Sequence, residues 1–289
     1  MRRFGLVLGA GGATAWVFHT GVLRTLEEGG RLQPSDAAVI VGTSAGSAVA
    51  AAVRAGETPD AVYRAAVTPP TSEEREAMRR EMREATRAWR PLSPGLARHA
   101  LPGGRGAGLA VAGLLPPGFF PTRWVEAFPG IGRLTSWPEG LWIPAVRASD
   151  GRVVVFGRDR TDVPVATAAE ASSAVPGMFR PKVIDGEPFV DGGVVSSTHA
   201  DLLLEAGVDL AVVSAPMSKP VVRPFAILAR RRLAAEVGAL RAAGIETVVV
   251  RPSAAAAAAA RGFPRRNPGA APVIADHAVA ATRLALAAA

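Results

Sequence analysis

The chain has 289 residues, enough to bury a large core in one α/β domain or in two small domains. Hydrophobic residues make up 49% and charged residues 20%, which excludes a disordered chain, and the formal charge of +8 permits contact with anionic surfaces without requiring it. There is no cysteine, which excludes a disulfide framework, a thiol nucleophile and thiolate metal sites.

The predicted elements alternate between strands and helices along most of the chain. Apolar runs and helical spacing predict, in order, a strand over 4–8, a helix over 15–28, a strand over 37–41 and helices over 47–55, 59–67 and 72–89. After an irregular segment over 91–140, they predict strands over 141–146, 153–156 and 183–190, a helix over 200–206, a strand over 210–213, a helix over 223–243, a strand over 247–250 and a helix over 273–288. This order predicts an α/β fold in three layers, with a central, mainly parallel sheet covered on both faces.

The first candidate functional residue is Ser44, in the pentapeptide Gly42-Thr43-Ser44-Ala45-Gly46. The serine follows an apolar strand and opens a helix, which is the setting of a nucleophile elbow. Glycines at positions 42 and 46 allow a strained turn that raises the side chain above the sheet, and the helix N-terminus favours negative charge nearby. The alternative interpretation is that Thr43 and Ser44 only cap the helix.

A glycine-rich loop, Gly9–Gly12, follows the first predicted strand. A dinucleotide-binding loop would need glycine at position 14, where Thr14 stands, and the Gly-Lys-Ser/Thr of a P-loop does not follow. The remaining interpretation is a run of backbone N–H groups that binds an oxyanion. A glycine-rich turn without a ligand is the alternative.

A serine nucleophile needs a base, and Asp191 is the candidate. The sequence offers histidines in no convincing catalytic setting: His19, His99, His199 and His277. Asp191 ends an apolar strand before Gly192 and Gly193, which predicts a carboxylate at the carboxyl edge of the sheet, where open α/β folds have their active sites. An aspartate deprotonates serine directly if burial raises its pKa toward the working pH. An ordinary Asp-Gly-Gly turn is the alternative.

Together, the glycine loop, the elbow at Ser44 and the Asp-Gly-Gly sequence at Asp191 resemble the patatin-like phospholipases in order and spacing. Three longer segments are also similar to the family: Leu6–Leu26, Ala171–Pro181 and Phe189–Asp201. The resemblance is best over 4–215. It implies a single hydrolase domain over 1–289, in which 91–140 is an insertion or lid-like segment and 251–289 is a C-terminal extension.

The resemblance implies a Ser-Asp dyad, with Ser44 as nucleophile and Asp191 as general base. The amides of Gly11, Gly12 and Ala13 would form the oxyanion hole, and the reaction would pass through an acyl-enzyme. Neither a metal nor a cofactor is implied. The expected activity is that of a serine lipid acyl hydrolase of the phospholipase A or lysophospholipase type.

The glycine loop departs from the family pattern, in which three glycines are followed by any residue, a basic residue and a glycine. Here Thr14 replaces the basic residue and Ala15 replaces the last glycine. Two alternatives therefore stay open. One is an esterase or thioesterase that acts on soluble acyl substrates with the same dyad, and the other is a catalytically inactive, lipid-binding relative.

The sequence also indicates where the protein acts. No apolar run reaches the ~20 residues needed to span a bilayer, and the first apolar run is too short for a signal peptide. We therefore expect a cytoplasmic protein that contacts a membrane surface transiently, with a lipid or acyl ester as substrate and no nucleic-acid partner. One apolar cluster is interpreted as local core or, alternatively, as a lip that enters lipid: Leu114, Leu115, Phe119, Phe120, Trp124 and Phe128.

Overall fold

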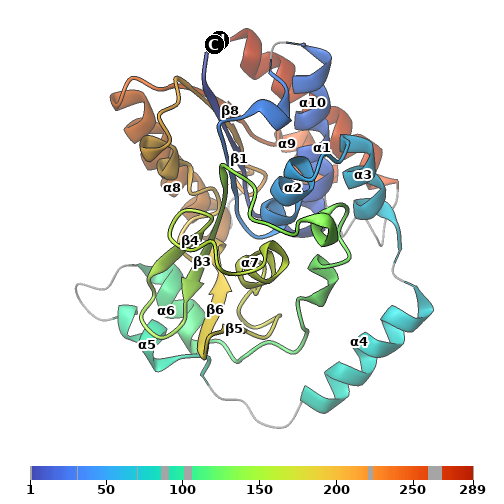
Figure 1. Ribbon diagram of the computed structural model, residues 1–289, viewed down its shortest axis with the longest axis vertical. Helices are drawn as coiled ribbons and strands as arrows, with labels where there is room; N and C mark the ends of the chain where they lie inside the picture. The colour runs from blue at the N-terminus through green and yellow to red at the C-terminus, as the bar shows by residue number, and fades with distance from the viewer. Residues whose placement is uncertain are drawn as a thin grey trace.

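The computed structural model describes residues 2–30, 32–69, 71–85, 91–100, 106–220, 224–259 and 269–288. Within these ranges one sheet contains eight strands: β1 (Phe4–Leu8), β2 (Val39–Gly42), β3 (Leu141–Arg147), β4 (Val153–Phe156), β5 (Lys182–Ile184), β6 (Glu187–Asp191), β7 (Leu210–Ser214) and β8 (Glu246–Val250). Their order across the sheet is β5-β6-β3-β2-β1-β7-β8, and β4 pairs with β3 outside that path. Figure 1 shows the sheet with helices on both sides.

The sheet has a parallel part and an antiparallel part. β2, β1, β7 and β8 run parallel, and β3 joins β2 through the pairs Ile40–Leu141 and Val41–Trp142. β3 then continues past the end of β2 and pairs in antiparallel fashion with β4 and β6. Because β6 runs against β3, its carboxyl end returns toward the carboxyl ends of β1 and β2. The predicted α/β fold with a mainly parallel central sheet is confirmed.

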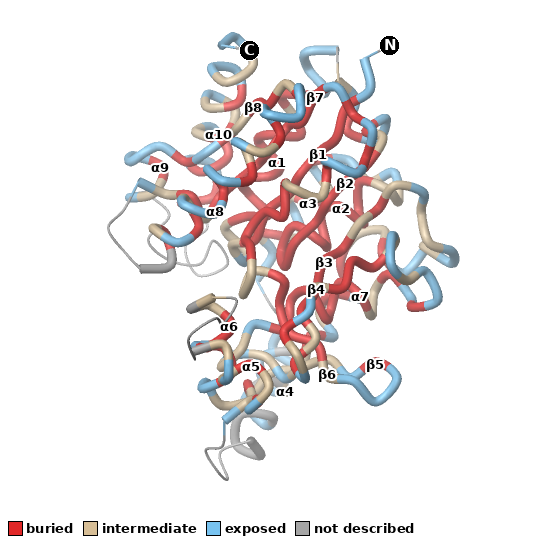
Figure 2. Tube along the Cα trace, turned by 90° about the vertical axis from the view of Figure 1, so that its left-hand side faces the viewer, coloured by how far each residue is buried: buried red, intermediate tan, exposed pale blue. Residues whose placement is uncertain are grey.

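The helices cover both faces of this sheet. Those described are α1 (Gly12–Glu28), α2 (Ala45–Arg54), α3 (Pro59–Val67), α4 (Ser72–Ala85), α5 (Pro94–Ala97), α6 (Ala107–Leu114), α7 (Val165–Ser172), α8 (Pro224–Ala242), α9 (Ala254–Ala259) and α10 (Ala270–Ala287). Alternate side chains of β1 point to opposite faces. Leu6 and Leu8 lie in a core with α1, α2, α7 and α10, whereas Val7 lies in a second core with α8 and the 3₁₀ segment Ala200–Glu205. Figure 2 shows the buried strands at the centre of the molecule.

A third, smaller core attaches α5 and α6 to the antiparallel part of the sheet. Leu96 of α5 and Leu109 of α6 pack with Val146 of β3 and Val190 of β6. Val190 immediately precedes Asp191. The two short helices therefore lie beside the end of β6 that carries the candidate acid.

The C-terminal helix α10 packs closely on α1. A methyl group on Gly21 of α1 would lie 2.5 Å from the carbonyl oxygen of Ala275, so only glycine permits this approach. Ala275 and Ala278 of α10 are buried in the same core as α1. The segment 251–289 thus contributes a helix to the main core. Among the helices described, none combines the length and the apolar content needed to cross a bilayer.

One prediction about the antiparallel part is corrected by the structure, and one helix is added. The segment 183–190, predicted as one strand, is a hairpin of β5 and β6. Asp185 and Gly186 have φ values of 50° and 79°, which reverse the chain between the two strands. Helix α7 is an element that the sequence prediction omitted.

Other predicted boundaries also differ from the structure. The irregular segment 91–140 contains α5 and α6, and the predicted helix over 200–206 is a 3₁₀ helix, Ala200–Glu205. The helix predicted over 72–89 is described as α4 to Ala85, and residues 86–90 lie outside the described residues.

Candidate active site

Ser44 lies at a sharp turn between β2 and α2. Its backbone has φ 55° and ψ −122°, a conformation that serine rarely adopts and that stores strain. Packing requires the flanking glycines. A methyl group on Gly42 would lie 2.7 Å from Cβ of Ala50, and one on Gly46 would overlap the carbonyl oxygen of Leu8. The chain therefore has the strand–turn–helix geometry of a nucleophile elbow at Ser44.

Two serines hold the elbow in this conformation. The Ser44 N–H group donates a hydrogen bond of 2.9 Å to Oγ of Ser172, and that hydroxyl donates one of 2.7 Å to the carbonyl oxygen of Pro144 in β3. The Ser47 hydroxyl donates a hydrogen bond of 2.6 Å to the carbonyl oxygen of Ser44. The strained backbone of Ser44 is thus fixed from both sides by buried hydroxyl groups.

Asp191 ends β6 and is buried, with 4% of its surface exposed. Its Oδ1 accepts a hydrogen bond of 2.6 Å from the Gly193 amide, and its carboxylate also accepts a hydrogen bond from the Ser44 side chain. Burial raises the pKa of Asp191 to about 7, although both hydrogen bonds act in the opposite direction. A carboxyl group with a pKa near neutrality, in contact with a serine hydroxyl, has the property required of a general base.

The glycine loop precedes α1, whose first residue is Gly12. Gly11 and Gly12 have φ values of 153° and 64°, which favour glycine at both positions. The first amides of an α-helix have no acceptor within the helix, and a methyl group on Gly12 would meet no atom within 4 Å. The amides at the start of α1 therefore lack acceptors within the helix, and there is open space beside Gly12.

The glycine loop lies against residues 192–199, the segment after Asp191 that we call the acid loop. The Ala10 amide donates a hydrogen bond of 2.7 Å to the carbonyl oxygen of Ser197, and a methyl group on Gly193 would lie 3.5 Å from Cβ of Ala10. Gly46, at the elbow, is in close contact with the end of β1 that leads into the same loop. The structure thus brings together the three segments that the sequence singled out: the glycine loop, the elbow and the acid loop.

A comparison with protein families matches residues 6–204 to the family described as Patatin-like phospholipase. The match covers more than half of the chain. The chain belongs to the patatin-like phospholipase family. Membership of this family supports hydrolysis of lipid esters. No curated protein matches the chain.

Solved structures similar to this patatin-like chain include VipD and ExoU. VipD from Legionella pneumophila aligns with a TM-score of 0.50 and 11% identity, over 99% of this chain and 67% of VipD. The type III effector protein ExoU aligns with a TM-score of 0.42 and 18% identity, over 98% of this chain and 53% of ExoU. The chain therefore spans about two thirds of VipD and about half of ExoU, and at these identities the likeness concerns the fold alone.

The patatin-like chain accommodates its unusual loop residues without losing the loop geometry. Ala15, which replaces a glycine of the family pattern, is fully buried, and a methyl group on Gly11 would lie 3.0 Å from its Cβ. Thr14 is half-buried in the first turn of α1. The substitution at position 14 removes a positive charge and leaves the backbone amides in place.

The buried histidines near the site are bonded to the backbone and to hydroxyl groups. His19 contacts the Ser214 hydroxyl at 2.8 Å and the carbonyl oxygen of Gly9 at 2.8 Å, and burial lowers its pKa to about 4. His199 contacts Oγ1 of Thr43 at 3.3 Å, and burial lowers its pKa to about 3. Both histidines are therefore neutral at physiological pH. His19 positions the glycine loop, a role that its sequence context did not reveal.

A buried carboxylate orders the second half of the acid loop. Glu236 of α8 accepts hydrogen bonds of 2.5 Å from the Ser196 and Thr198 hydroxyls and one of 3.1 Å from the Ala200 amide. Glu236 and Ser172 were not predicted from the sequence. The charged residue sits in an ordinary helical pattern, and the serine is adjacent to a second serine, so neither stands out without the tertiary contacts.

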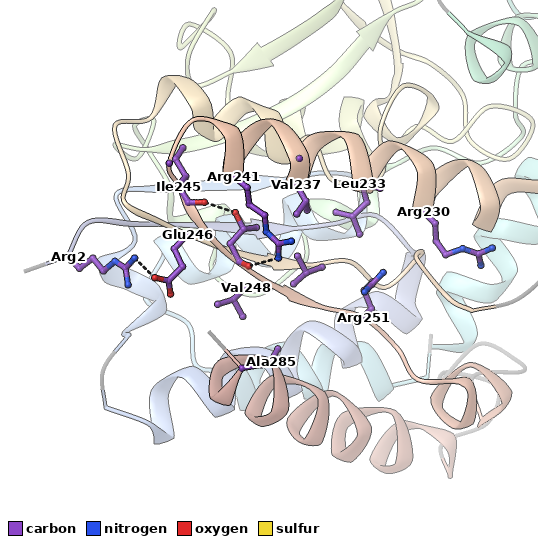
Figure 3. A pocket seen from close by; sticks show the side chains of 16 residues that line it. Arg2, Arg230, Leu233, Val237, Arg241, Ile245, Glu246, Val248, Arg251 and Ala285 are labelled. Carbon is purple, nitrogen blue, oxygen red and sulfur yellow. Dashed lines mark hydrogen bonds and ion pairs between the residues drawn. The ribbon is translucent and has the colours of Figure 1, made fainter.

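A cavity of about 860 Å³ lies away from these residues, along β8 and between α8 and α10 (Figure 3). Arg230 and Arg241 from α8, Val248 from β8 and Ala285 from α10 are among the residues that line it. Its lining includes neither Ser44 nor Asp191. The cavity is therefore separate from the candidate active site.

Proposed function

We propose that the protein is a serine lipid acyl hydrolase of the phospholipase A or lysophospholipase type, with a Ser44–Asp191 dyad. The observation that carries the proposal is that the Ser44 side chain interacts with a buried carboxyl group, Asp191, whose pKa burial raises to about 7. At neutral pH a large fraction of Asp191 is ionised and basic enough to accept the serine proton.

In the proposed first step, the Asp191 carboxylate accepts the proton of the Ser44 hydroxyl while Oγ forms a bond to the carbonyl carbon of the ester. The N–H groups of Gly11, Gly12 and Ala13 stabilise the negative charge that develops on the carbonyl oxygen. The bond between the carbonyl carbon and the alcohol oxygen then breaks. The alcohol leaves with the proton from Asp191, and the acyl group remains esterified to Ser44.

In the second step, Asp191 accepts a proton from water while the water oxygen attacks the acyl-enzyme. The bond between the acyl carbon and Ser44 Oγ breaks, and Ser44 recovers its proton from Asp191. The products are an alcohol and a fatty acid. Gly42 and Gly46 support this chemistry by allowing the strained elbow, and Gly192 and Gly193 by allowing the turn whose amide contacts Asp191.

A second candidate function is hydrolysis of soluble acyl esters or thioesters by the same dyad. Thr14 favours it, because the loop lacks the positive charge that would attract a substrate phosphate. The two candidates differ in substrate. A lipid hydrolase releases fatty acid from phospholipid vesicles, whereas a soluble esterase cleaves only short, water-soluble esters.

Covalent labelling tests the proposed nucleophile. The protein is incubated with a fluorophosphonate probe, digested and mapped by mass spectrometry, with Ser44→Ala as the control. We expect the adduct on the peptide that contains Ser44 and no adduct in the variant. Labelling of another residue contradicts Ser44 as the nucleophile. No labelling of the folded wild-type protein contradicts the proposal and favours an inactive relative.

A further inference from the structure

Five exposed apolar side chains gather beside the candidate active site, and we call them the apolar rim. They come from α6, from the residue that follows it and from the segment after α7: Val111, Leu114, Leu115, Val175 and Met178, which are 44%, 54%, 37%, 36% and 44% exposed. Single exposed apolar residues are common on soluble proteins, but a contiguous group marks an interaction surface.

The second part of the rim is joined directly to the dyad. Val175 follows Ala174, whose carbonyl oxygen accepts a hydrogen bond of 3.0 Å from the Asp191 amide. Ser172, which holds the Ser44 backbone, lies three residues before Val175. The segment that carries Val175 and Met178 is therefore a wall of the site.

Helix α6 joins the two parts of the rim. Gly108, Val111 and Leu115 share one face of the helix, because they are three and four residues apart. At one end of this face, a methyl group on Gly108 would overlap the carbonyl oxygen of Val194 in the acid loop. At the other end, a methyl group on Gly177 would lie 3.6 Å from Cδ1 of Leu115. The face thus extends from the acid loop to the segment of Val175 and Met178.

Aromatic side chains connect this wall to the elbow. The ring centroids of Phe179 and Trp124 are 6.4 Å apart, and those of Trp124 and Trp16 are 5.1 Å apart. The Trp16 indole donates a hydrogen bond of 3.0 Å to the carbonyl oxygen of Ala45, the residue after Ser44. Packed aromatic side chains therefore link the segment of Met178 and Phe179 to the backbone beside the nucleophile.

The charged residues of the two stretches that carry the rim are all basic. The rim-bearing stretches 106–125 and 173–183 contain no aspartate or glutamate, and their basic residues include the exposed Arg123 and Arg180. The nearest acidic residues along the chain are Glu126, Asp185 and Glu170, and Glu170 is buried and paired with Lys182. An apolar surface bordered by arginines matches the boundary of an anionic bilayer, where acyl chains lie beneath phosphate groups.

We propose that the apolar rim inserts into the surface of an anionic lipid bilayer and that Arg123 and Arg180 bind its phosphate groups. This docking would place Ser44 next to the ester bonds of membrane lipids. The proposal rests on the proposed function for its substrate, but binding to a bilayer is measured independently of hydrolysis.

The test is co-sedimentation of the full chain with vesicles of phosphatidylcholine alone and of phosphatidylcholine with phosphatidylglycerol. The double variant Leu114→Asp, Met178→Asp places two carboxylates in the rim. Leu284→Asp is the matched control, because Leu284 is 74% exposed on α10, whose C-terminal end lies at the opposite end of the molecule from α6 (Figure 1). Leu114, Met178 and Leu284 are all exposed, so aspartate at these positions should leave the fold intact. Thermal unfolding of each variant checks this.

We expect the double variant to lose affinity for the mixed vesicles about tenfold or more. Leu284→Asp should bind like wild type, and it should cleave p-nitrophenyl butyrate at the wild-type rate. Arg123→Glu with Arg180→Glu should weaken binding to the mixed vesicles and leave binding to neutral vesicles unchanged. Met178→Asp alone, as a milder variant, should show part of the loss.

Unchanged vesicle binding by the double variant, or an equal loss in Leu284→Asp, overturns the proposal. So does binding that is independent of phosphatidylglycerol. If the wild-type protein binds the mixed vesicles through the rim but does not cleave p-nitrophenyl butyrate, the proposed function fails while the docking surface stands.

Discussion

Replacing Asp191 with asparagine should change how the stability of the protein depends on pH. The folded protein raises the pKa of this carboxyl from 3.8 to about 7 by burying it. Between pH 3.8 and about pH 7 the native state holds a proton on Asp191 that the unfolded state has lost. The protonated carboxyl group therefore contributes its full stability below pH 3.8, and this contribution is lost as the pH rises to about 7. Asparagine has no such proton and removes this pH dependence.

The expected change in unfolding free energy follows from the pKa shift of Asp191. A difference of about 3 pKa units corresponds to about 4 kcal/mol, of which about 3 kcal/mol falls between pH 5 and pH 8. The neutral amide that the substitution introduces can still accept the hydrogen bond from Gly193, so the fold should persist. Asp191→Asn should therefore gain about 3 kcal/mol of unfolding free energy relative to wild type on going from pH 5 to pH 8.

Urea unfolding followed by tryptophan fluorescence at pH 5, 6, 7 and 8 measures this difference directly. All other titrating groups are common to both proteins and cancel in the comparison. Ser44→Ala is the control, because it keeps the buried carboxyl group of Asp191. Loss of the Ser44 side chain raises the pKa of Asp191 further, so the pH dependence of stability should persist in this variant. A difference between Asp191→Asn and wild type that stays constant over this range would refute the argument that burial raises the pKa of Asp191.

Two further predictions concern the rate and the elbow. The value of kcat/KM should rise about tenfold per pH unit below pH 7 and level off above it, because only the ionised Asp191 accepts the serine proton; a rate independent of pH from 5 to 7 would contradict this. Ser172→Ala should lower kcat more than it changes KM and cost about 1–2 kcal/mol of stability, because the Ser44 amide loses its acceptor. Ser173→Ala is the matched control, since that buried hydroxyl has no hydrogen-bond partner among the described residues, and equal kinetic effects in both variants would contradict the positioning role of Ser172.

Much of the fold follows from local patterns in the sequence. The continuous apolar run Phe4–Leu8 predicts a strand buried on both faces, and it is one. Thr58 and Pro59 predict the start of α3, where the Thr58 side chain accepts a hydrogen bond from the Ala61 amide. These features depend on residues near in the sequence, so periodicity and capping rules suffice to find them.

Features that depend on distant contacts could not be predicted in this way. The reversal at Asp185 and Gly186 is an exception, because Asp-Gly is a local hairpin signal and the prediction of one strand over 183–190 overlooked it. Helix α6 consists of alanine, glycine, valine and leucine without amphipathic spacing, and it is stabilised by packing on β3 and β6. A tertiary contact outweighs weak local preference in such a segment.

The candidate site also combines features that local sequence predicts with features that depend on distant contacts. Ser44 and Asp191 were found from the glycines that flank them, because tight turns constrain the sequence locally. Their mutual arrangement depends on β3 overrunning β2, so that the antiparallel β6 returns Asp191 to the elbow. Asp191 therefore lies at the carboxyl edge of the parallel strands, as predicted, although β6 runs opposite to them.

The central claim is that Ser44 works with Asp191 and without a histidine base. Its most direct test compares initial rates of p-nitrophenyl butyrate hydrolysis at pH 8 by wild type, Asp191→Asn and His199→Ala. We predict that Asp191→Asn loses hydrolysis by about three orders of magnitude or more, on the order of the effect of removing a catalytic base, while His199→Ala keeps activity within about tenfold of wild type. Activity retained in Asp191→Asn and abolished in a folded His199→Ala would contradict the dyad.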